Sequence, residues 1–476
     1  MNIAEKIFQS ADPKATAVIE KGIACTYEVL DLRSKLVASW LGEREGFFPT
    51  ARIGLTGADS LSYLVLSLGI LRAGGCFVPI AQELSRSEAE ELSRTLYLDG
   101  ILDSSAGIEE PAFVTLSHPS CPWQQDYASL NPALIRFSSG TTGDAKGILL
   151  SHETLLDRII TANAGLGIGP DDRILWVLSM AHHYVVSILL YLCRGATIIL
   201  PESHRADALI DEAVAHGATV LYGAPFHYVM LGAGEHHSKW PTLRLAVSTT
   251  AGITHSAAES FASIYGVHPS QALGVMEVGL PFVNHDAASE KPDSIGRPQD
   301  GVEARLLDEE GGPVQHGMNG RLEVRCRGIF DAYLSPWRPS DGVTREGGWF
   351  ATGDIAHADE EGYYYLKGRT KTVISVGGMK FFPEEVEDVL MTHPGVSEAR
   401  VMAREHSIFG SFMEAEVVLS GDAPVTDAEL LKLCKGKLAR YKIPARIVFV
   451  EKIPRTASGK IQRYQSQDQA SGSPLS

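Results

Sequence analysis

The segment IRFSSGTTGDAKGILLSH, residues 135–152, places small hydroxyl residues and glycines between two apolar runs and adds a single lysine, Lys146. Backbone N–H groups and hydroxyls in such a loop can bind polyphosphate oxygens, and the lysine can supply the opposing charge. The same residue types also favour an ordinary turn between two strands. On composition alone, the segment fits both interpretations.

Two standard nucleotide-binding motifs do not match this chain. A Walker A loop requires Gly-Lys followed by Ser or Thr, but Lys146 is preceded by Ala145 and followed by Gly147. The other candidate, GLGIGP at residues 165–170, lacks the third glycine of the dinucleotide fingerprint and ends in proline. Both kinds of nucleotide site are therefore disfavoured.

Five further motifs follow along the chain. They are LGVME at 273–277, DSIGRP at 293–298, GGWFATGD at 347–354, GRTKTVISVGGMKFFPEEVE at 368–387 and PRTASGKIQR at 454–463. Together with SSGTTGDAKG, they resemble in order and spacing the motifs of the adenylate-forming superfamily: acyl- and aryl-CoA synthetases, peptide-synthetase adenylation domains and luciferase. The resemblance is greatest to stand-alone acyl-CoA synthetases. It implies that a carboxylic acid is joined to ATP as an acyl-adenylate and then passed to a thiol.

The resemblance assigns roles to the charged residues of these motifs. Two anions meet when a carboxylate attacks the α-phosphate, so such a site needs positioned cations. Lys460 would be the adenylation lysine, Asp354 and Arg369 would bind the ribose, and Glu277 would hold Mg²⁺ and take part in catalysis. Each residue also has a purely structural alternative. Lys460 and Glu277 can be solvated surface residues, Asp354 can form an Asx turn, and Arg369 can form an ordinary ion pair at a domain interface.

The remaining implied nucleotide contacts come from the glycine-rich loop and from two later segments. They are Ser138, Ser139, Gly140, Thr141, Thr142, Gly143, Lys146, Thr250, Ala251, Leu273, Gly274 and Met276. Three positions depart from the family pattern. Ala145 replaces a proline, Leu273 an aromatic residue that packs on adenine, and Met276 a threonine that contacts phosphate. The last two raise the alternative of an ATP-binding homologue without turnover.

The acid pocket is expected to be apolar with scattered hydroxyls. Its implied residues are His182, Tyr222, Gly223, Ala224, Ser248, Thr249, Gly252, Leu273 and Val275. The segment MAHHYVVSILL contains no acid to pair with a substrate ammonium, and burying an unpaired ammonium is costly. We therefore expect a fatty, branched or aryl acid rather than an α-amino acid. His182 can orient the carboxylate, although a lone buried histidine is often structural.

The sequence pattern around these residues predicts a layered α/β structure. Residues 52–80 alternate strand, helix and strand, and similar alternation around 196–250 predicts a mostly parallel sheet. Beyond about residue 295, short alternating runs predict a small β subdomain. We expect an N-terminal AMP-binding domain over 1–370, a mobile α+β lid over 371–465 and a disordered tail over 466–476.

The resemblance implies that the lid rotates between the two half-reactions. Lys371 would be the hinge, and Gly377 and Gly378 would line the tunnel for the thiol. The two glycines can also simply form a turn between strands. The acceptor thiol is expected on CoA or on the phosphopantetheine of a separate acyl carrier protein, because no carrier domain follows residue 463. A luciferase-like oxidation of the adenylate shares every motif.

The composition argues against several other classes of protein. The formal net charge of -16 argues against a general nucleic-acid binder, and the most apolar stretch is interrupted by His182 and His183, which argues against a membrane span. The six cysteines form no C-x-x-C pair, and the N-terminus carries no signal-peptide pattern. We expect a cytoplasmic protein with reduced thiols.

Overall fold

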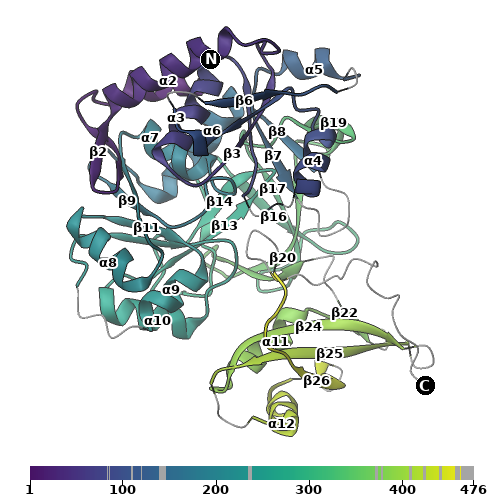
Figure 1. The fold of residues 1–476 in the computed structure, drawn as a ribbon. Coiled ribbons are helices and arrows are strands. Elements are labelled where there is room, and N and C mark those ends of the chain that lie inside the picture. The colour runs from purple at the N-terminus through teal and green to yellow at the C-terminus, as the bar shows by residue number, and fades with distance from the viewer. Residues whose placement is uncertain are drawn as a thin grey trace, which may run out of the picture. The chain divides into compact units, whose positions relative to one another are not determined.

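This computed structural model forms two compact units. The structure describes residues 1–82, 84, 86–108, 111–118, 121–138, 146–233, 239–369, 374–376, 379–406, 410–421, 425–438, 442–455 and 461. The larger unit comprises Met1–Ser139, Ala145–Ala304 and Val324–Phe350, and the smaller one contains the described residues of Arg305–Glu323 and of the chain from Ala351 onward. Figure 1 labels the elements of both units.

One sheet of the larger unit has eight strands in the order β19-β18-β8-β7-β4-β3-β5-β6. Its strands are β3 (Arg52–Thr56), β4 (Cys76–Pro79), β5 (Gly100–Asp103), β6 (Ala112–Thr115), β7 (Pro132–Ser138), β8 (Lys146–Ser151), β18 (Ala332–Leu334) and β19 (Trp337–Pro339). The strands from β7 to β5 run parallel, whereas β6, β8, β18 and β19 pair antiparallel.

The other sheet has nine strands in the order β15-β14-β13-β12-β11-β9-β10-β1-β2. Its strands are β1 (Thr16–Glu20), β2 (Ile23–Thr26), β9 (Arg173–Trp176), β10 (Thr197–Leu200), β11 (Val220–Gly223), β12 (Leu245–Ser248), β13 (Ser270–Val275), β14 (Gly279–Val283) and β15 (Arg297–Pro298). The strands from β13 to β1 run parallel. The predicted parallel order thus holds in the centre of each sheet, and the strands toward the edges pair antiparallel.

Helices cover both sheets, and several of them begin at a residue whose side chain caps the helix. They are α1 (Ile3–Ser10), α2 (Tyr27–Gly42), α3 (Leu61–Arg72), α4 (Arg86–Thr95), α5 (Gln124–Ser129), α6 (His152–Leu166), α7 (Leu190–Cys193), α8 (Ala206–Ala215), α9 (Pro225–Gly232) and α10 (His255–Tyr265), with a π-helical turn η2 (Val185–Leu189) before α7. The Ser60 side chain caps α3 by accepting the Tyr63 N–H, and Ser151 caps α6 by accepting the Thr154 N–H. The strand, helix and strand predicted over 52–80 are β3, α3 and β4.

The smaller unit contains most of a four-stranded sheet, a hairpin and a three-stranded sheet with two helices. Its elements are β16 (Glu303–Leu307), β17 (Gly320–Arg325), β20 (Phe350–Ala358), β21 (Tyr364–Arg369), β22 (Ile374–Val376), β23 (Met379–Phe381), α11 (Pro383–Met391), β24 (Val396–His406), β25 (Gly410–Leu419), α12 (Asp427–Lys437) and β26 (Arg446–Phe449). The short strands expected beyond residue 295 and the two amphipathic helices of the lid are therefore present.

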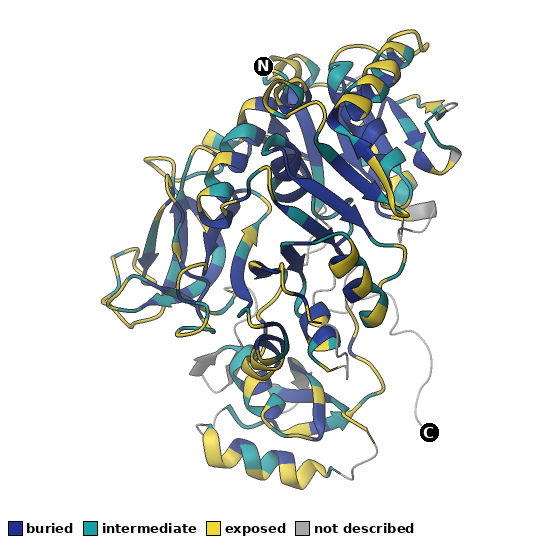
Figure 2. Ribbon diagram, turned by 90° about the vertical axis from the view of Figure 1, so that its left-hand side faces the viewer, coloured by how far each residue is buried: buried dark blue, intermediate teal, exposed yellow. Residues whose placement is uncertain are grey.

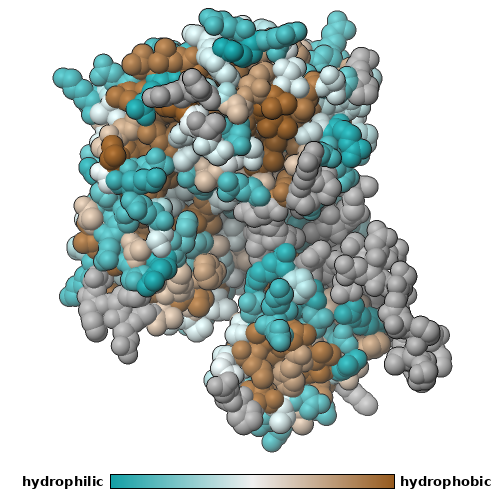
Figure 3. Space-filling model, viewed as in Figure 1, coloured by the Kyte–Doolittle hydropathy of each residue, from teal (hydrophilic) through white to brown (hydrophobic). Residues whose placement is uncertain are grey.

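Burial follows this layering. Figure 2 shows buried residues gathered on the strands and on the inward faces of the helices, while exposed residues lie on the outer helix faces. In the view of Figure 3, hydrophobic residues form a patch on the surface of the smaller unit. Among the described residues, no helix is long and apolar enough to cross a membrane. The expected domain boundary at 370/371 lies outside the described residues, so it stays a prediction.

Candidate active site

Four neighbouring parallel strands end on one side of the nine-stranded sheet. Tyr222 and Gly223 end β11, Ser248 ends β12, Val275 ends β13, and His182 follows β9. The register pairs Gly223 with Ser248 across β11 and β12. Because parallel strands end on the same side, the fold brings together the segments predicted to hold the acid, at the edge where α/β proteins usually bind ligands.

The side chains at these strand ends include buried hydroxyls. Tyr222 is only 2% exposed, and burial raises its pKa to about 12 although it hydrogen-bonds Thr249. The Thr249 N–H donates to the Gly223 carbonyl at 3.0 Å. The Ser248 hydroxyl is buried and has no hydrogen-bond partner in the described part of the chain. Buried hydroxyls therefore lie at the strand ends to which the acid is assigned, and the pocket itself stays a prediction.

The segment after β12 has an unusual backbone. Thr250 has a φ of +77°, a left-handed conformation that is rare for a β-branched residue and clusters at functional sites. Ala251, Gly252 and Gly274 are exposed, and Leu273 is partly buried. Ala224 is the N-cap residue of α9. The binding roles of these residues stay predictions.

Glu277 lies in the turn between β13 and β14 and is fixed by two hydrogen bonds. Its Oε1 accepts the Tyr333 hydroxyl at 2.9 Å, and its carbonyl accepts the Phe330 N–H at 2.8 Å. Burial and the neighbouring Glu277 carboxylate raise the pKa of Tyr333, so Tyr333 stays protonated as the donor. The turn is thus attached to the segment that leads into β18.

Arg158 of α6 anchors the same turn. It is 4% exposed, and its Nη1 donates to the Met276 carbonyl at 2.9 Å while its Nε donates to the Gly328 carbonyl at 2.7 Å. A Cβ on Gly328 would lie 2.9 Å from the Arg158 Cγ, so a glycine is needed there. Met276 is 36% exposed, and only its carbonyl is used here. The turn is therefore held although Met276 stands where the family has threonine.

The residues around Glu277 fit a Mg²⁺ ion bound mainly by substrate. Magnesium prefers oxygen ligands, keeps several waters, and is typically held by one or two carboxylates plus phosphates. No group of three or more His, Cys, Asp and Glu side chains that could hold a metal occurs among the described residues. Glu277 is a single oriented carboxylate, which suits this mode of binding.

In the smaller unit, Asp354 and Arg369 face each other across β20 and β21. The Arg369 Nε lies 3.2 Å from the Asp354 Oδ1, and its Nη2 donates to the Thr352 carbonyl at 2.9 Å. A Cβ on Gly353, whose φ is +80°, would lie 3.3 Å from the Arg369 Nη2. The two residues predicted to bind ribose are therefore neighbours, with 8% of Asp354 exposed and its carboxylate oriented by the arginine.

Several predicted site residues lie outside the described residues. They are Ser139, Gly140, Thr141, Thr142, Gly143, Lys371, Gly377, Gly378 and Lys460. Ser138 and Lys146 pair across β7 and β8, which confirms the two strands predicted around the loop. The position of their side chains is likewise not described.

Sequence reasoning missed Arg158 and Tyr333. Arg158 interrupts an apolar stripe on α6 formed by Leu155, Ile159 and Ala162, all buried. A charged residue in a buried stripe must be paired or hydrogen-bonded, so this position carried a usable signal. Tyr333 carried none, because its partner is 56 residues away in the sequence.

Known proteins share both the sequence and the fold. Residues 7–334 match the family model for AMP-binding enzymes, and residues 385–460 match that for their C-terminal domain. A sulfoacetate–CoA ligase of Cupriavidus necator is 31% identical over 75% of this chain and 73% of its own. A feruloyl-CoA synthase of an Amycolatopsis species is 27% identical over 94% of both. The crystal structure of ATP-bound MatB from Rhodopseudomonas palustris has a TM-score of 0.86 at 26% identity, with 97% of both chains covered.

These matches cover both parts of the chain in the order that its motifs predicted. The resemblance to adenylate-forming enzymes is confirmed, and so is the expected α/β fold with a small C-terminal α+β part. The chain belongs to the AMP-binding enzyme family, as an ATP-dependent, AMP-forming acid–CoA ligase.

Proposed function

We propose that the protein converts a non-amino carboxylic acid, ATP and CoA into an acyl-CoA, AMP and pyrophosphate in two steps. First, a carboxylate oxygen bonds to the α-phosphorus while the bond to pyrophosphate breaks. Then the CoA thiol, losing its proton, attacks the acyl carbon and AMP leaves. The observation that carries this proposal is the common edge at which β9, β11, β12 and β13 end beside the anchored Glu277 turn.

Electrostatics decides the first step, because the carboxylate and ATP repel each other. We assign Lys460 to the charge that develops between carboxylate and α-phosphate, and the loop of Ser138–Gly143 with Lys146 to the other phosphates. In this proposal Asp354 accepts hydrogen bonds from the ribose hydroxyls, while its ion pair with Arg369 keeps the carboxylate in place.

Magnesium enters this proposal as a partner of the ATP phosphates. Glu277 would hold it, and the ion would neutralise charge on the phosphate oxygens. The Tyr333 hydroxyl and the Arg158 guanidinium orient the Glu277 carboxylate and its backbone before the nucleotide binds.

We infer the class of acid substrate from the residues of the predicted acid pocket and not from the names of the relatives. The segment 180–190 carries no carboxylate for an amino group, which favours an acid without a charged amine. The relatives are named for sulfoacetate and for ferulate, so their names do not select one acid. Fatty, branched and aryl acids remain the proposed range, with His182 orienting the reacting carboxylate.

We also propose the two-domain mechanism. The AMP-binding domain would cover 1–370, the lid 371–465 and a tail 466–476, with Lys371 as the hinge and Gly377 and Gly378 lining the thiol tunnel. The short hairpin of β22 and β23 flanks these glycines. A rotation at Lys371 would exchange the adenylation arrangement for the thioester arrangement.

A cytoplasmic location is proposed from the thiols. All six cysteines are free, three of them buried. Burial raises the pKa of Cys76 to about 12, which keeps it an unreactive thiol. Free thiols are typical of proteins in reducing compartments.

Acid-dependent exchange of pyrophosphate into ATP, measured over a panel of acyl, aryl and amino acids, tests the first step. Thioester formation with CoA or with a phosphopantetheinylated acyl carrier protein then tests the acceptor. We expect exchange with non-amino acids and faster transfer to CoA. Faster transfer to the carrier protein favours the alternative acceptor, and ATP binding without exchange favours a homologue that has lost turnover through Leu273 and Met276.

A further inference from the structure

Arg136 in β7 is a half-buried arginine for which the described residues provide no counter-charge. It follows the buried residues Ala133, Leu134 and Ile135 in the same strand. Within the described part of the chain, no carboxylate pairs with its guanidinium and no hydrogen bond engages it. Burial lowers its pKa to about 10, so Arg136 stays charged at neutral pH. A charge in such a position is costly unless something compensates it.

Tyr63 supplies a second unsatisfied donor beside it. Its side chain is fully buried, and its hydroxyl has no hydrogen-bond partner among the residues that the structure describes. Burial raises the pKa of Tyr63 well above its usual value, so the hydroxyl keeps its proton. Phe77 joins Tyr63 to the face of Arg136, because its ring contacts the Tyr63 ring and it opposes Leu134, two residues before Arg136. Among the described residues, the Tyr63 hydroxyl and the Arg136 guanidinium therefore both lack an acceptor.

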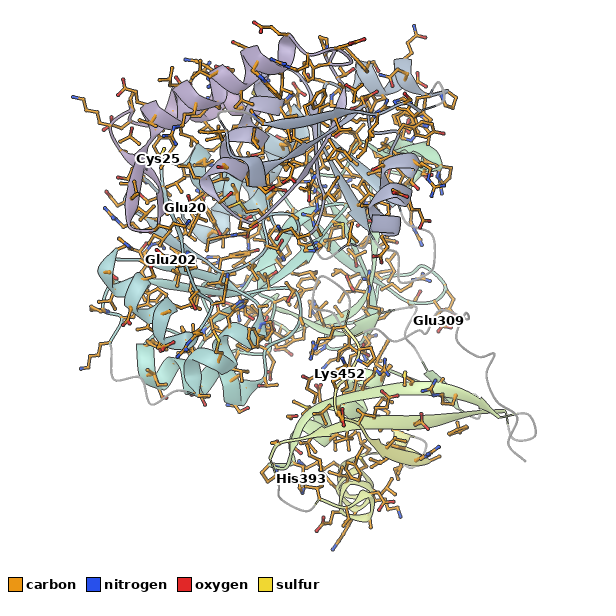
Figure 4. All side chains as sticks on the ribbon, in the orientation of Figure 1. Glu20, Cys25, Glu202, Glu309, His393 and Lys452 are labelled. Atoms are coloured by element: carbon orange, nitrogen blue, oxygen red, sulfur yellow. The ribbon has the colours of Figure 1, made fainter. Side chains whose placement is uncertain are left out.

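Tyr63 is held firmly by the start of α3. The Ser60 side chain accepts the Tyr63 N–H at 3.1 Å, and Glu20, labelled in Figure 4, accepts the Leu61 N–H at 3.1 Å. The Tyr63 ring packs against Phe77 edge-on, with 6.1 Å between ring centroids. A fixed helix start and a packed ring leave the hydroxyl with little freedom to find another partner.

The sheet places Arg136 beside the segment that follows His182. Phe77 and Leu134 are directly opposed in β4 and β7, so they lie on the same face, and Arg136 two residues later shares it. On this face Phe77 contacts both Tyr63 and Tyr184, the latter with 4.9 Å between ring centroids. Unlike Tyr63, Tyr184 has a partner for its hydroxyl, the hydroxyl of Ser67.

Arg158 is a charged neighbour of Arg136. The two arginines lie close enough for their charges to interact, and Arg158 holds the Met276 carbonyl. Arg158 also has acidic neighbours in Glu277 and Asp331. Arg136 thus shares a sheet face with Phe77, whose ring contacts Tyr184, two residues after His182, which is assigned to the acid.

We propose that Arg136, supported by Tyr63, binds a second anionic group of the acid substrate, a carboxylate or sulfonate at the end away from the carboxylate that is activated. This inference rests on the ligase function proposed above. Arginine matches such groups with two parallel N–H donors, and the tyrosine hydroxyl can add a third. The acid is then a dianion, which narrows the fatty, branched and aryl range.

The ATP phosphates are a less suitable partner for Arg136. Ser138, where the glycine-rich loop begins, lies two residues further along the strand, about 6.6 Å at the usual rise. The described residues that interact electrostatically with Arg136 are Tyr63 and Arg158, and neither belongs to the predicted phosphate-binding set. A single arginine with one tyrosine hydroxyl suits one carboxylate or sulfonate better than a hydrated polyphosphate.

The test compares acids of equal length. Straight-chain dicarboxylates of two to six carbons and the matching monocarboxylates are assayed by acid-dependent ATP–pyrophosphate exchange, with the wild type and Arg136→Met, Arg136→Lys, Tyr63→Phe and the control Arg173→Met. Arg173 is a half-buried arginine at the opposite end of β9 from His182, and its Nη1 donates to the His216 carbonyl. Thermal unfolding verifies that each variant is folded.

We expect the wild type to prefer the dicarboxylate in at least one pair, by kcat/KM. Arg136→Met should lower that preference about 100-fold, leave the KM for ATP unchanged and keep activity with the monocarboxylate. The preference for the dicarboxylate should fall less in Arg136→Lys than in Arg136→Met. It should fall about 10-fold in Tyr63→Phe and stay unchanged in Arg173→Met.

Two results overturn the inference. One is a wild type that prefers the monocarboxylate in every pair. The other is an Arg136→Met variant that loses activity equally with both members of a pair, and a raised KM for ATP would then assign Arg136 to phosphate. Exchange with monocarboxylates alone would leave the ligase function standing while refuting the second anionic group. Absence of exchange with any acid would instead refute the ligase function itself.

Discussion

Arg158 connects three parts of the larger unit through one side chain. It extends from α6 to the carbonyl of Met276 in the Glu277 turn and to the carbonyl of Gly328, two residues before Phe330, which also contacts that turn. Tyr333 then fixes the Glu277 carboxylate itself. An oriented carboxylate loses little freedom when a cation binds, so these contacts serve catalysis through preorganisation. Neither residue touches substrate in this account, and both are positioning residues.

Replacing Tyr333 by phenylalanine should raise the magnesium requirement. The change removes the donor to Glu277 and keeps the ring, so the carboxylate is no longer held in one direction. We expect the Mg²⁺ concentration for half-maximal pyrophosphate exchange to rise about 10-fold, the value of one hydrogen bond to a charged group. Tyr265→Phe, which removes a hydroxyl bonded to the Leu231 carbonyl, is the control. Unchanged magnesium dependence would contradict the role of Tyr333.

Replacing Asp354 by alanine tests the ribose contact. The carboxylate would no longer accept hydrogen bonds from the two hydroxyls, and we expect the KM for ATP to rise about 10- to 100-fold. Arg325→Met is a control in the same sheet, because Arg325 pairs with the exposed Glu303. If the KM for ATP rises equally in both variants, the effect comes from a general change in the sheet, and the ribose contact of Asp354 is contradicted.

Helix α6 joins the functional turn to the N-terminus of the chain. It begins at His152, whose Nδ1 accepts the Ile3 N–H at 3.1 Å, and it continues to Arg158. His227 near the start of α9 likewise accepts the Ala224 N–H at 3.1 Å through Nδ1. An accepting nitrogen must be unprotonated, so both contacts require neutral imidazole.

The larger unit should therefore lose stability in mild acid. Burial lowers the pKa of His152 and of His227 to about 4, below the usual value of about 6.5. As pH falls through the usual value, the unfolded chain takes up protons that the folded chain does not. The free energy of unfolding should drop by about 2 kcal/mol per histidine between pH 7 and pH 5.

Urea unfolding of the wild type and of His152→Asn at both pH values measures this effect. Asparagine can accept the Ile3 N–H without titrating, so the variant should lose about 2 kcal/mol less on acidification. His255→Asn, at an exposed histidine, is the control. An identical pH dependence in wild type and His152→Asn would contradict the assignment.

Elements with strong local signals were predictable from the sequence. The apolar spacing of residues 61–71 predicted α3, and the apolar runs around the glycine-rich loop predicted β7 and β8. Strand β18 could not be predicted, because its residues 332–334 pair with β8, which lies about 180 residues earlier in the sequence. The contacts of Arg158 depend on the same long-range packing, so residue types alone could not reveal them.

Motifs along the whole chain predicted more of the function than of the geometry. The six segments identified the family and the two-part fold, since each motif keeps its local residue types whatever its distant neighbours are. They did not show that Asp354 and Arg369 are cross-strand neighbours, or that Phe77 contacts both Tyr63 and Tyr184. Those pairs arise from strand register and sheet order, which depend on the entire core.

A proline at the hinge should separate the two half-reactions. Proline fixes φ near -65°, so Lys371→Pro would oppose the backbone rotation that exchanges the two arrangements. We expect acid-dependent pyrophosphate exchange within a few-fold of the wild type and thioester formation reduced about 100-fold. Lys371→Ala, which keeps the backbone free, is the control. Equal loss of both half-reactions would contradict the hinge.

Acid-dependent ATP–pyrophosphate exchange by the wild type and Lys460→Ala tests the central claim most directly. The account predicts exchange by the wild type with at least one non-amino acid, and a loss of about 100- to 1,000-fold when the ammonium group is removed. Equal rates in Lys460→Ala and wild type, or no exchange with any acid, would contradict it.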